Sequence, residues 1–167
     1  MRSLSNKCAT LTRKIADDQL DVLLMSETWH EGSDDVSLAR ATPVGYRCLD
    51  AARPLPAGAS TLIDRAQHRG GLALIYRDNI KAKTKTLQPT TTFEHLCCHM
   101  TAGDEHLLLL GVYRPGSFAA PAPFFDELSA VLEQLCTYRC PIVILGDFNV
   151  HVDVNDDTNA LRLKTLL

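Results

Sequence analysis

Residues 106–113 read His-Leu-Leu-Leu-Leu-Gly-Val-Tyr, and residues 141–147 read Pro-Ile-Val-Ile-Leu-Gly-Asp. Each contains a short apolar run with the length of a buried strand. The chain between them carries apolar residues at the spacing of an amphipathic helix: Phe124, Phe125, Leu128, Val131, Leu132 and Leu135. Two strands joined by a helix run parallel in one sheet, so we expect parallel strands ending at Tyr113 and Leu145. The segment therefore predicts an α/β or α+β fold with a mixed sheet.

The chain before this crossover is divided by turn residues. Gly70-Gly71 opens a buried strand at 72–76. Residues 93–100 and 106–113 are expected to pair around a turn at 102–104, because Ala-Gly-Asp suits a turn between two strand-like runs. Together these two runs predict a hairpin.

The N-terminal part of the chain predicts a helix followed by a strand. Apolar side chains recur at helical spacing at Leu4, Cys8, Leu11 and Ile15, and the apolar run at 21–25 has the length of a buried strand.

Glycine and proline recur in residues 31–67, so we expect mostly loop there, with one short strand at 46–49. Residues 157–167 predict a final helix, because capping Asp and Thr precede its apolar positions.

Residues 80–86 alternate three lysines, Lys81, Lys83 and Lys85, onto one face of an expected strand. Two interpretations stay open. Lysines on an edge strand hinder unwanted pairing with another chain, and a row of lysines can also contact phosphates.

The composition is typical of one soluble globular domain: 167 residues, 46% hydrophobic and 22% charged. The formal net charge of -3 gives no global field toward nucleic acid or an anionic membrane, so a polyanion has to be met by a local patch or a metal. No window approaches the ~18 apolar residues of a membrane span, and no apolar signal core follows Met1. We expect no membrane partner and an intracellular location, in the nucleus or the cytoplasm.

The six cysteines form no CxxC motif and predict reduced thiols. His95, Cys97 and His99 would share one face of a strand. Three ligands on one face do not close the tetrahedron that zinc prefers, so we do not expect a zinc site.

Three reactive side chains stand at the ends of expected strands: Glu27, Tyr113 and Asp147. Ligands of open α/β sheets bind beyond the carboxyl ends of strands, so these side chains indicate a site. Two carboxylates favour Mg²⁺ or Mn²⁺, because these ions prefer oxygen ligands and keep part of their water. Each residue also has a plain alternative: a solvated strand end, a packing tyrosine or an ordinary turn.

Five stretches, in order, resemble the endonuclease/exonuclease/phosphatase superfamily, and most of all the endonuclease domain of non-LTR retrotransposons. They are Ser26-Glu27-Thr28-Trp29, Gly70-Gly71-Leu72-Ala73-Leu74-Ile75-Tyr76, Gly111-Val112-Tyr113-Arg114-Pro115, Phe125-Asp126-Glu127-Leu128 and Ile144-Leu145-Gly146-Asp147-Phe148-Asn149. The resemblance implies the four-layer α/β sandwich of the deoxyribonuclease I type, with two sheets face to face and helices outside.

The resemblance also implies roles for residues at matching positions. Glu27 would bind the Mg²⁺ that neutralises the scissile phosphate, and Tyr113 would hydrogen-bond a phosphate oxygen. Asp147 would orient or deprotonate the attacking water, and Asn149 would help hold the phosphate.

Two further residues are weaker candidates for substrate binding. Arg114 lies beside Tyr113, with a solvated strand-end charge as the equal alternative, and His30 is close enough to Glu27 to line a cleft. His151 follows Asn149 too closely to be the family's catalytic histidine, and we expect it to be structural.

Against the family pattern, residues 1–167 look like a single domain that is incomplete in its second half. The pattern has a metal-binding asparagine two residues before an Arg-Ser-Leu, found here at residues 2–4, and a Ser-Asp-His motif that would lie beyond Leu167. From missing strands we expect exposed apolar area and an unpaired sheet edge. The sequence makes no prediction of the oligomeric state.

The function predicted from this resemblance is a Mg²⁺-dependent phosphodiester hydrolase whose partner is DNA, which in its complete form nicks DNA to prime reverse transcription. One alternative is an inactive, transposon-derived fragment or binding module. Another is a phosphatase of the same superfamily acting on an inositol phosphate or a sphingolipid.

Overall fold

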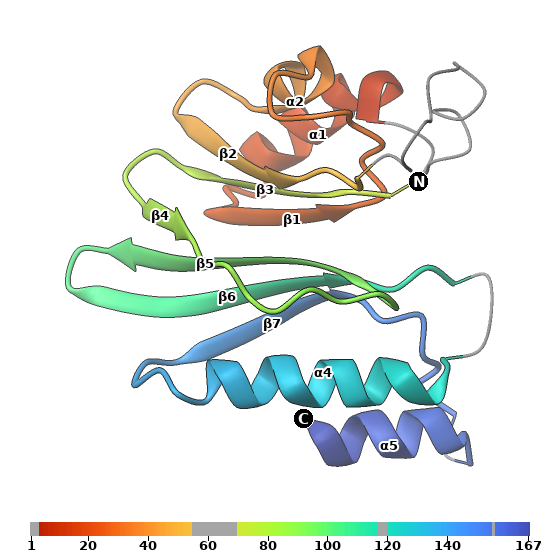
Figure 1. Ribbon diagram of the computed structural model, residues 1–167. Helices are drawn as coiled ribbons and strands as arrows, with labels where there is room; N and C mark the ends of the chain where they lie inside the picture. Colours follow the sequence, from red (N-terminus) through yellow and green to blue (C-terminus); the bar gives the residue numbers. More distant parts are fainter. Residues whose placement is uncertain (1–3, 55–69, 117–119, 155) are drawn as a thin grey trace.

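The computed structural model describes residues 4–54, 70–116, 120–154 and 156–167. Two β-sheets lie face to face with helices on the outer face of each (Figure 1). In chain order the elements are η1 (Leu4–Asn6), α1 (Cys8–Asp17), β1 (Val22–Ser26), α2 (Val36–Ala41), β2 (Tyr46–Ala51), β3 (Leu72–Arg77), β4 (Lys81–Thr84), β5 (Glu94–Ala102), β6 (Glu105–Tyr113), α4 (Ala122–Leu135), β7 (Ile142–Asp147) and α5 (Thr158–Leu166). The predicted four-layer sandwich is confirmed.

The N-terminal sheet has the strand order β1-β3-β2 and is antiparallel throughout. Helices α1 and α2 cover its outer face (Figure 1). Their apolar side chains pack against β1 and β3 in a cluster that contains Leu4, Leu11, Ile15, Met25, Leu38, Ala41, Ala73 and Ile75. The predicted amphipathic helix therefore buries its apolar stripe, because that stripe faces the sheet.

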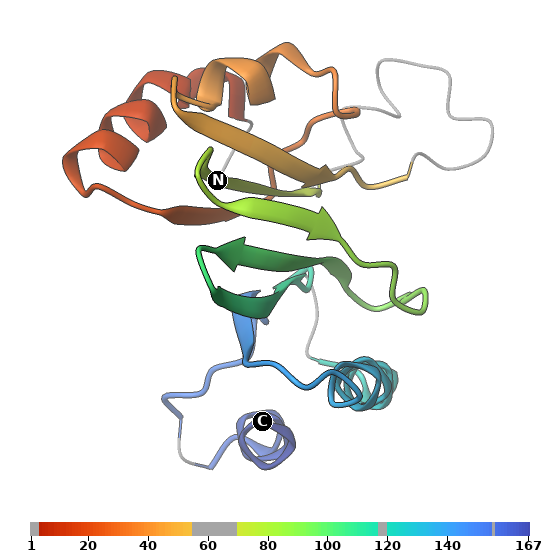
Figure 2. The same cartoon turned by 90° about the vertical axis from the view of Figure 1, so that its left-hand side faces the viewer.

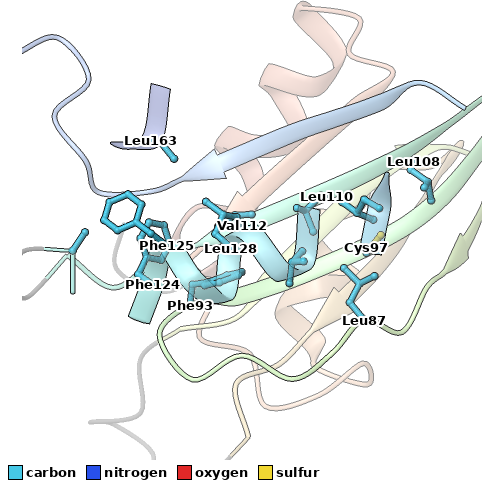
Figure 3. Packing of buried hydrophobic residues seen from close by; sticks show 13 residues of the cluster. Leu87, Phe93, Cys97, Leu108, Leu110, Val112, Phe124, Phe125, Leu128 and Leu163 are labelled. Atoms are coloured by element: carbon cyan, nitrogen blue, oxygen red, sulfur yellow. The ribbon is translucent and has the colours of Figure 1, made fainter. Parts of the chain in front are cut away.

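The second sheet has the strand order β4-β5-β6-β7, and its outer face is covered by α4 and α5, which Figure 2 shows end-on. Strands β6 and β7 are parallel, in a register from Leu108↔Ile142 to Tyr113↔Asp147. Figure 3 shows how Leu110 and Val112 of β6 meet Phe124 and Leu128 of α4. The predicted crossover is confirmed.

A third apolar layer fills the space between the two sheets. It is made of alternate residues from both sheets: Leu72, Leu74, Tyr76, Leu96, Cys98, Met100, Leu109 and Tyr113. The sheets approach closely at Gly111, where an added Cβ would lie 2.7 Å from Leu24 Cδ1. A side chain at this position would push the sheets apart, which explains the glycine in an otherwise apolar strand.

One side of the sandwich is open among the residues that the structure describes. There β1 is the edge strand of one sheet and β7 the edge strand of the other. Val143 and Leu145 of β7 are each 37% exposed on this edge strand. Every open sheet has edge strands, so the expectation of missing strands stays a prediction.

Most predicted elements are found close to their expected places. The hairpin of 93–100 with 106–113 is β5 and β6, the buried strand at 72–76 is β3, and the final helix is α5. The lysine-bearing strand is β4, at the edge of its sheet.

The expectation for residues 31–67 is partly wrong. Val36–Ala41 form α2, and the predicted strand at 46–49 extends to Ala51. A six-residue helix is too short to show periodicity; its one local signal is Asp35, whose side chain caps it by accepting a hydrogen bond from the backbone N–H of Ser37 at 2.7 Å. Residues 55–67 of this predicted loop and the Arg2-Ser3 of the family pattern lie outside the described residues.

Glu127 of α4 anchors the loop that leads into β5. Its carboxylate accepts hydrogen bonds from the backbone N–H groups of Thr91 and Thr92 at 2.9–3.0 Å and from both hydroxyls at 2.6 Å. Burial opposes ionisation, but these donors outweigh it and lower the pKa of Glu127 to about 2. The loop is thereby fixed to the helix by one ionised group.

We expect Glu127→Gln to lower the free energy of unfolding by about 1.5–3 kcal/mol at pH 7, because hydrogen bonds to a charged group are lost. A depressed pKa contributes stability that is complete above about pH 4.5 and is lost as the pH falls through about 2. Urea unfolding should therefore show a gap between wild type and Glu127→Gln at pH 7 that closes toward pH 2. Glu133→Gln, on the exposed face of the same helix, is the control, and an equal effect from it would contradict this account.

Candidate active site

Glu27, Tyr113 and Asp147 lie at one end of the sandwich, as predicted. Glu27 directly follows β1, Tyr113 ends β6 and Asp147 ends β7. The arrowheads of these three strands point to the same end in Figure 1. The strands belong to two different sheets, so the site is formed where the carboxyl ends of both sheets meet.

Tyr113 connects the two sheets at this end. Its backbone pairs with Asp147 in one sheet, and its hydroxyl donates a hydrogen bond of 2.5 Å to Glu27 Oε1 of the other. The tyrosine side chain is otherwise buried in the layer between the sheets. One residue, through its backbone and its side chain, therefore fixes the relative positions of Glu27 and Asp147.

Glu27 and Tyr113 each have one protonation state at neutral pH. The hydrogen bond from Tyr113 lowers the pKa of Glu27, against the opposing effect of burial, and Arg53 lowers it further. Burial and the neighbouring Glu27 carboxylate raise the pKa of the Tyr113 phenol. Glu27 is thus an anion and Tyr113 a neutral donor.

The loop after β1 has an uncommon backbone. Glu27 and Trp29 have positive φ angles of 55° and 56°, which non-glycine residues seldom adopt. The loop is held by backbone hydrogen bonds from Thr28 to Gly71 at 3.4 Å and from Trp29 to Gly70 at 2.8 Å. Strained backbone of this kind persists only where the surroundings hold it in place, and it is common at functional sites.

His30 is buried between this loop and β2 and contacts both. Its side chain is 0% exposed, with Nδ1 2.7 Å from Thr28 Oγ1 and Nε2 3.1 Å from Asp50 Oδ2. The sequence predicts that His30 lines the cleft. The structure instead encloses its ring between the loop and β2. A contact of His30 with substrate remains only a prediction.

Beside the site lies an ion pair between Arg53 and Glu94, which the sequence did not predict. Arg53 donates through Nε to Glu94 Oε1 at 2.6 Å and also through Nη2, and Glu94 Oε2 accepts from the backbone N–H of Gly71 at 2.5 Å. This pair ties the end of β2 to the start of β5 next to Glu27. The two residues are 41 positions apart and belong to no motif, so no sequence signal joined them.

The loop after β7 is also tightly defined. Gly146 has φ +145°, and an added Cβ would lie 1.9 Å from the carbonyl oxygen of Val112. Asn149 has φ 48°, and its backbone N–H donates to Asp147 Oδ1 at 3.0 Å. Its side chain donates from Nδ2 to the carbonyl oxygen of Arg114 at 2.6 Å.

Arg114 is 3% exposed, and its guanidinium holds the same loop. It donates to the carbonyl oxygens of Phe148 at 2.7 Å, Asn149 at 2.5 Å and Pro115 at 3.1 Å. This placement gives Arg114 a structural role and excludes the expected alternative of a solvated charge. Phosphate contacts by Arg114 and Asn149 stay predictions.

The donor set suits a hard divalent cation. Glu27 and Asp147 offer carboxylate oxygens, and Asp147 is exposed to solvent. Within residues 4–54, 70–116, 120–154 and 156–167, no group of three or more His, Cys, Asp and Glu is arranged to hold a metal. With two carboxylates as ligands, a cation here would keep several water molecules, as Mg²⁺ commonly does.

The fold and the site define a class: a two-sheet α/β sandwich that gathers carboxylates and a phenol at the carboxyl ends of its strands. Residues 6–164 match the model of the Endonuclease/Exonuclease/phosphatase family, and the chain belongs to that family. No curated protein sequence matches the chain significantly.

Three solved structures illustrate the shared fold. The human Nocturnin catalytic domain with bound sulfate is 17% identical, with TM-score 0.62 over 87% of this chain and 57% of that one. The 3′ phosphatase NExo from Neisseria, bound to a product DNA hairpin, is 16% identical, with TM-score 0.62 over 99% of this chain and 66% of that one. The endonuclease domain of TRAS1, a telomere-specific non-LTR retrotransposon, is 11% identical, with TM-score 0.63 over 99% of this chain and 64% of that one.

The chain thus spans between 57% and 66% of the length of these three structures.

Among the described residues, no helix is long and apolar enough to cross a membrane.

We expect Tyr113→Phe to raise the pKa of Glu27, because the largest cause of its depression is the Tyr113 hydrogen bond. The lost bond should lower the free energy of unfolding at pH 7 by about 1.5–3 kcal/mol. Because a depressed carboxyl pKa stabilises the fold only above that pKa, the difference should shrink as the pH falls through it. Carbon-13 NMR titration of the glutamate side chains and urea unfolding measure both effects. Tyr46→Phe, which removes a hydroxyl bonded to the Leu20 carbonyl, is the control and should leave Glu27 unchanged.

We expect Gly146→Ala to lower the free energy of unfolding by at least about 2 kcal/mol, since the new methyl group meets the Val112 carbonyl and the backbone becomes strained. Gly32→Ala is the matched control, because no atom lies within 4 Å of its added Cβ. Thermal unfolding of both variants checks this. A loss of stability in Gly146→Ala as small as that in Gly32→Ala would show that a glycine is not required at position 146.

Proposed function

We propose that this chain carries the catalytic edge of a Mg²⁺-dependent phosphodiester hydrolase, an endonuclease of the non-LTR retrotransposon type that nicks DNA. The observation that carries the proposal is the Tyr113 bridge, which holds Glu27 and Asp147 together where two sheets end. Family membership supports hydrolysis of a phosphate ester as the reaction class.

The residues divide the chemistry between them. A divalent cation supplies charge neutralisation at the scissile phosphate. Glu27, ionised at neutral pH, would hold that cation. Asp147, exposed at the strand end and fixed through the Asn149 backbone N–H, would orient the attacking water or take its proton.

Tyr113 has a protonated hydroxyl whose proton now points to Glu27. Its role would be to donate that hydrogen bond to a phosphoryl oxygen as negative charge grows there. Arg114 and Asn149 keep the Asp147 loop in place, so the attacking group is positioned before substrate arrives.

DNA as the substrate is supported by similar folds described with DNA. The NExo structure contains a product DNA hairpin, and the TRAS1 domain comes from a retrotransposon. The sequence around Trp29 and Arg114-Pro115 resembles the endonuclease domain of non-LTR retrotransposons, which favours nicking. NExo is also described as a 3′ phosphatase, so removal of a terminal phosphate from DNA is the second candidate.

Nicking of supercoiled plasmid with Mg²⁺ tests the proposal. We expect Mg²⁺-dependent nicking that Asp147→Asn and Glu27→Gln each reduce at least about 100-fold, because each removes a charged group of the reaction. Asp17→Asn, at the exposed C-terminal end of α1 ahead of β1, is the charge-matched control and should nick like wild type. If the gene continues beyond residue 167, the longer product is assayed beside this chain.

Other outcomes separate the alternatives. Release of inorganic phosphate from a 3′-phosphorylated hairpin, without nicking, would favour the phosphatase. Metal-independent DNA binding without any turnover, in this chain and in any longer product of the gene, would favour a binding module and overturn the nuclease proposal.

A further inference from the structure

A second charged surface lies on the outer face of the β4-β5-β6-β7 sheet, away from the candidate active site. Lys83 pairs across the strands with His99, and Lys81 pairs with Thr101, which in turn pairs with His106. We call Lys81, Lys83, His99, Thr101 and His106 the lysine–histidine patch.

The register places these side chains on one face. His99 is paired with Leu108, whose side chain packs into the helix-facing core, while the alternate residues Cys98 and Met100 pack between the sheets. Cross-strand partners stand on the same face of a sheet, about 4.5–5.5 Å apart. The patch is therefore a continuous surface of the three strands, at the end of the sheet opposite the arrowheads of β6 and β7 (Figure 1).

The lysines of the patch carry unneutralised charge. Both are exposed, and within the part of the chain that the structure describes no carboxylate pairs with either. The neighbouring Lys85 instead lies over the Tyr138 ring, with Nζ 5.3 Å from its centroid. The nearby acids are Asp104 and Glu105, in and after the β5–β6 turn.

The two histidines add hydrogen-bond donors to this charge. Their ring centroids are 5.9 Å apart with an interplanar angle of 31°, so the imidazoles lie side by side. His106 is exposed and His99 is partly exposed. Imidazole N–H and lysine ammonium groups are both common donors to phosphate oxygens.

We propose that the lysine–histidine patch binds the phosphate backbone of a nucleic acid. The chain has a net charge of -3, so its overall field repels a polyanion and contact requires a local basic surface. Lysines two residues apart on a strand stand about 6.6 Å apart, so Lys81 and Lys83 present two cationic groups side by side to one phosphate backbone. Contacts to phosphate oxygens carry no sequence information, so we expect this contact to be sequence-independent.

The patch is separate from the candidate active site. From the pair Glu94↔Tyr113 to the pair Thr101↔His106 the ladder advances seven residues, about 23 Å. Binding at the patch therefore needs neither the carboxylates nor a divalent cation, and it is tested without turnover.

Fluorescence anisotropy of a labelled duplex in EDTA, over a salt series of about 50–200 mM, measures this binding. We expect Lys81→Glu/Lys83→Glu to weaken binding at low salt by roughly 10-fold or more and to reduce the slope of log K against log salt by about 2. Arg40→Glu/Lys164→Glu makes the same change in net charge at exposed positions on other elements and should weaken binding less than about 3-fold. Lys81→Arg/Lys83→Arg should bind like wild type.

The glutamate variant also distinguishes phosphate binding from protection of the sheet edge. Glutamates keep the edge charged, so the variant should stay as monodisperse as wild type in light scattering while losing affinity. If it binds as tightly as wild type, or if the two charge-reversal doubles weaken binding equally, the inference is wrong. A chain that nicks DNA but shows either result overturns this inference and leaves the proposed function standing.

Parallel titrations with DNA and RNA duplexes of one sequence distinguish the two sources of phosphate. Equal affinity identifies the shared backbone as the ligand. Failure of the wild-type chain to bind either duplex overturns the inference.

Discussion

The hydrogen bond between Tyr113 and Glu27 is the contact on which the arrangement of the site depends. Tyr113 belongs by its backbone to one sheet and by its hydroxyl to the other. Apolar packing between sheets resists their separation but is non-directional, so it does not fix a hydroxyl and a carboxylate to within hydrogen-bond distance. A single directional bond at the end of the sandwich does, and it also keeps Glu27 ionised.

The two loops that carry the acids obey the same constraint by different means. Glu27, Trp29 and Asn149 all have positive φ angles, and each loop is held from behind by a buried cationic or imidazole side chain. Arg114 donates to the carbonyls of one loop, and His30 contacts the hydroxyl of Thr28 in the other. The sequence left Arg114 as a phosphate contact or a solvated charge with equal weight, and it placed His30 in the lining of the cleft; contact of either with substrate stays a prediction. Burial gives them the task of keeping strained backbone in place, which a solvated side chain could not do.

Much of the fold could be predicted from the sequence because its elements are local and periodic. A few consecutive residues are enough to predict the apolar stripe of α4, the apolar run of β7 and the turn between β5 and β6. The helix α2 does not, because six residues give less than two turns of pattern. In the site, strand-end residues were found, whereas Arg53–Glu94 and His30–Asp50 were not, since these pairs join positions 41 and 20 residues apart that meet only after the sheets form.

The charges of this chain are separated along the strands. The carboxylates of Glu27 and Asp147 lie where β1 and β7 end, and two lysines of β4, which pair with no carboxylate of the described residues, lie at the other end of the sandwich. A polyanion is repelled by the first region unless a cation neutralises it, and attracted by the second without one. Under the two proposals, salt would act on the two ends differently: counterion release would govern affinity at the lysines, while occupancy of a divalent cation would govern reactivity at the carboxylates. Affinity and turnover would then be independent properties of one small sandwich, each altered by substitutions that leave the other intact.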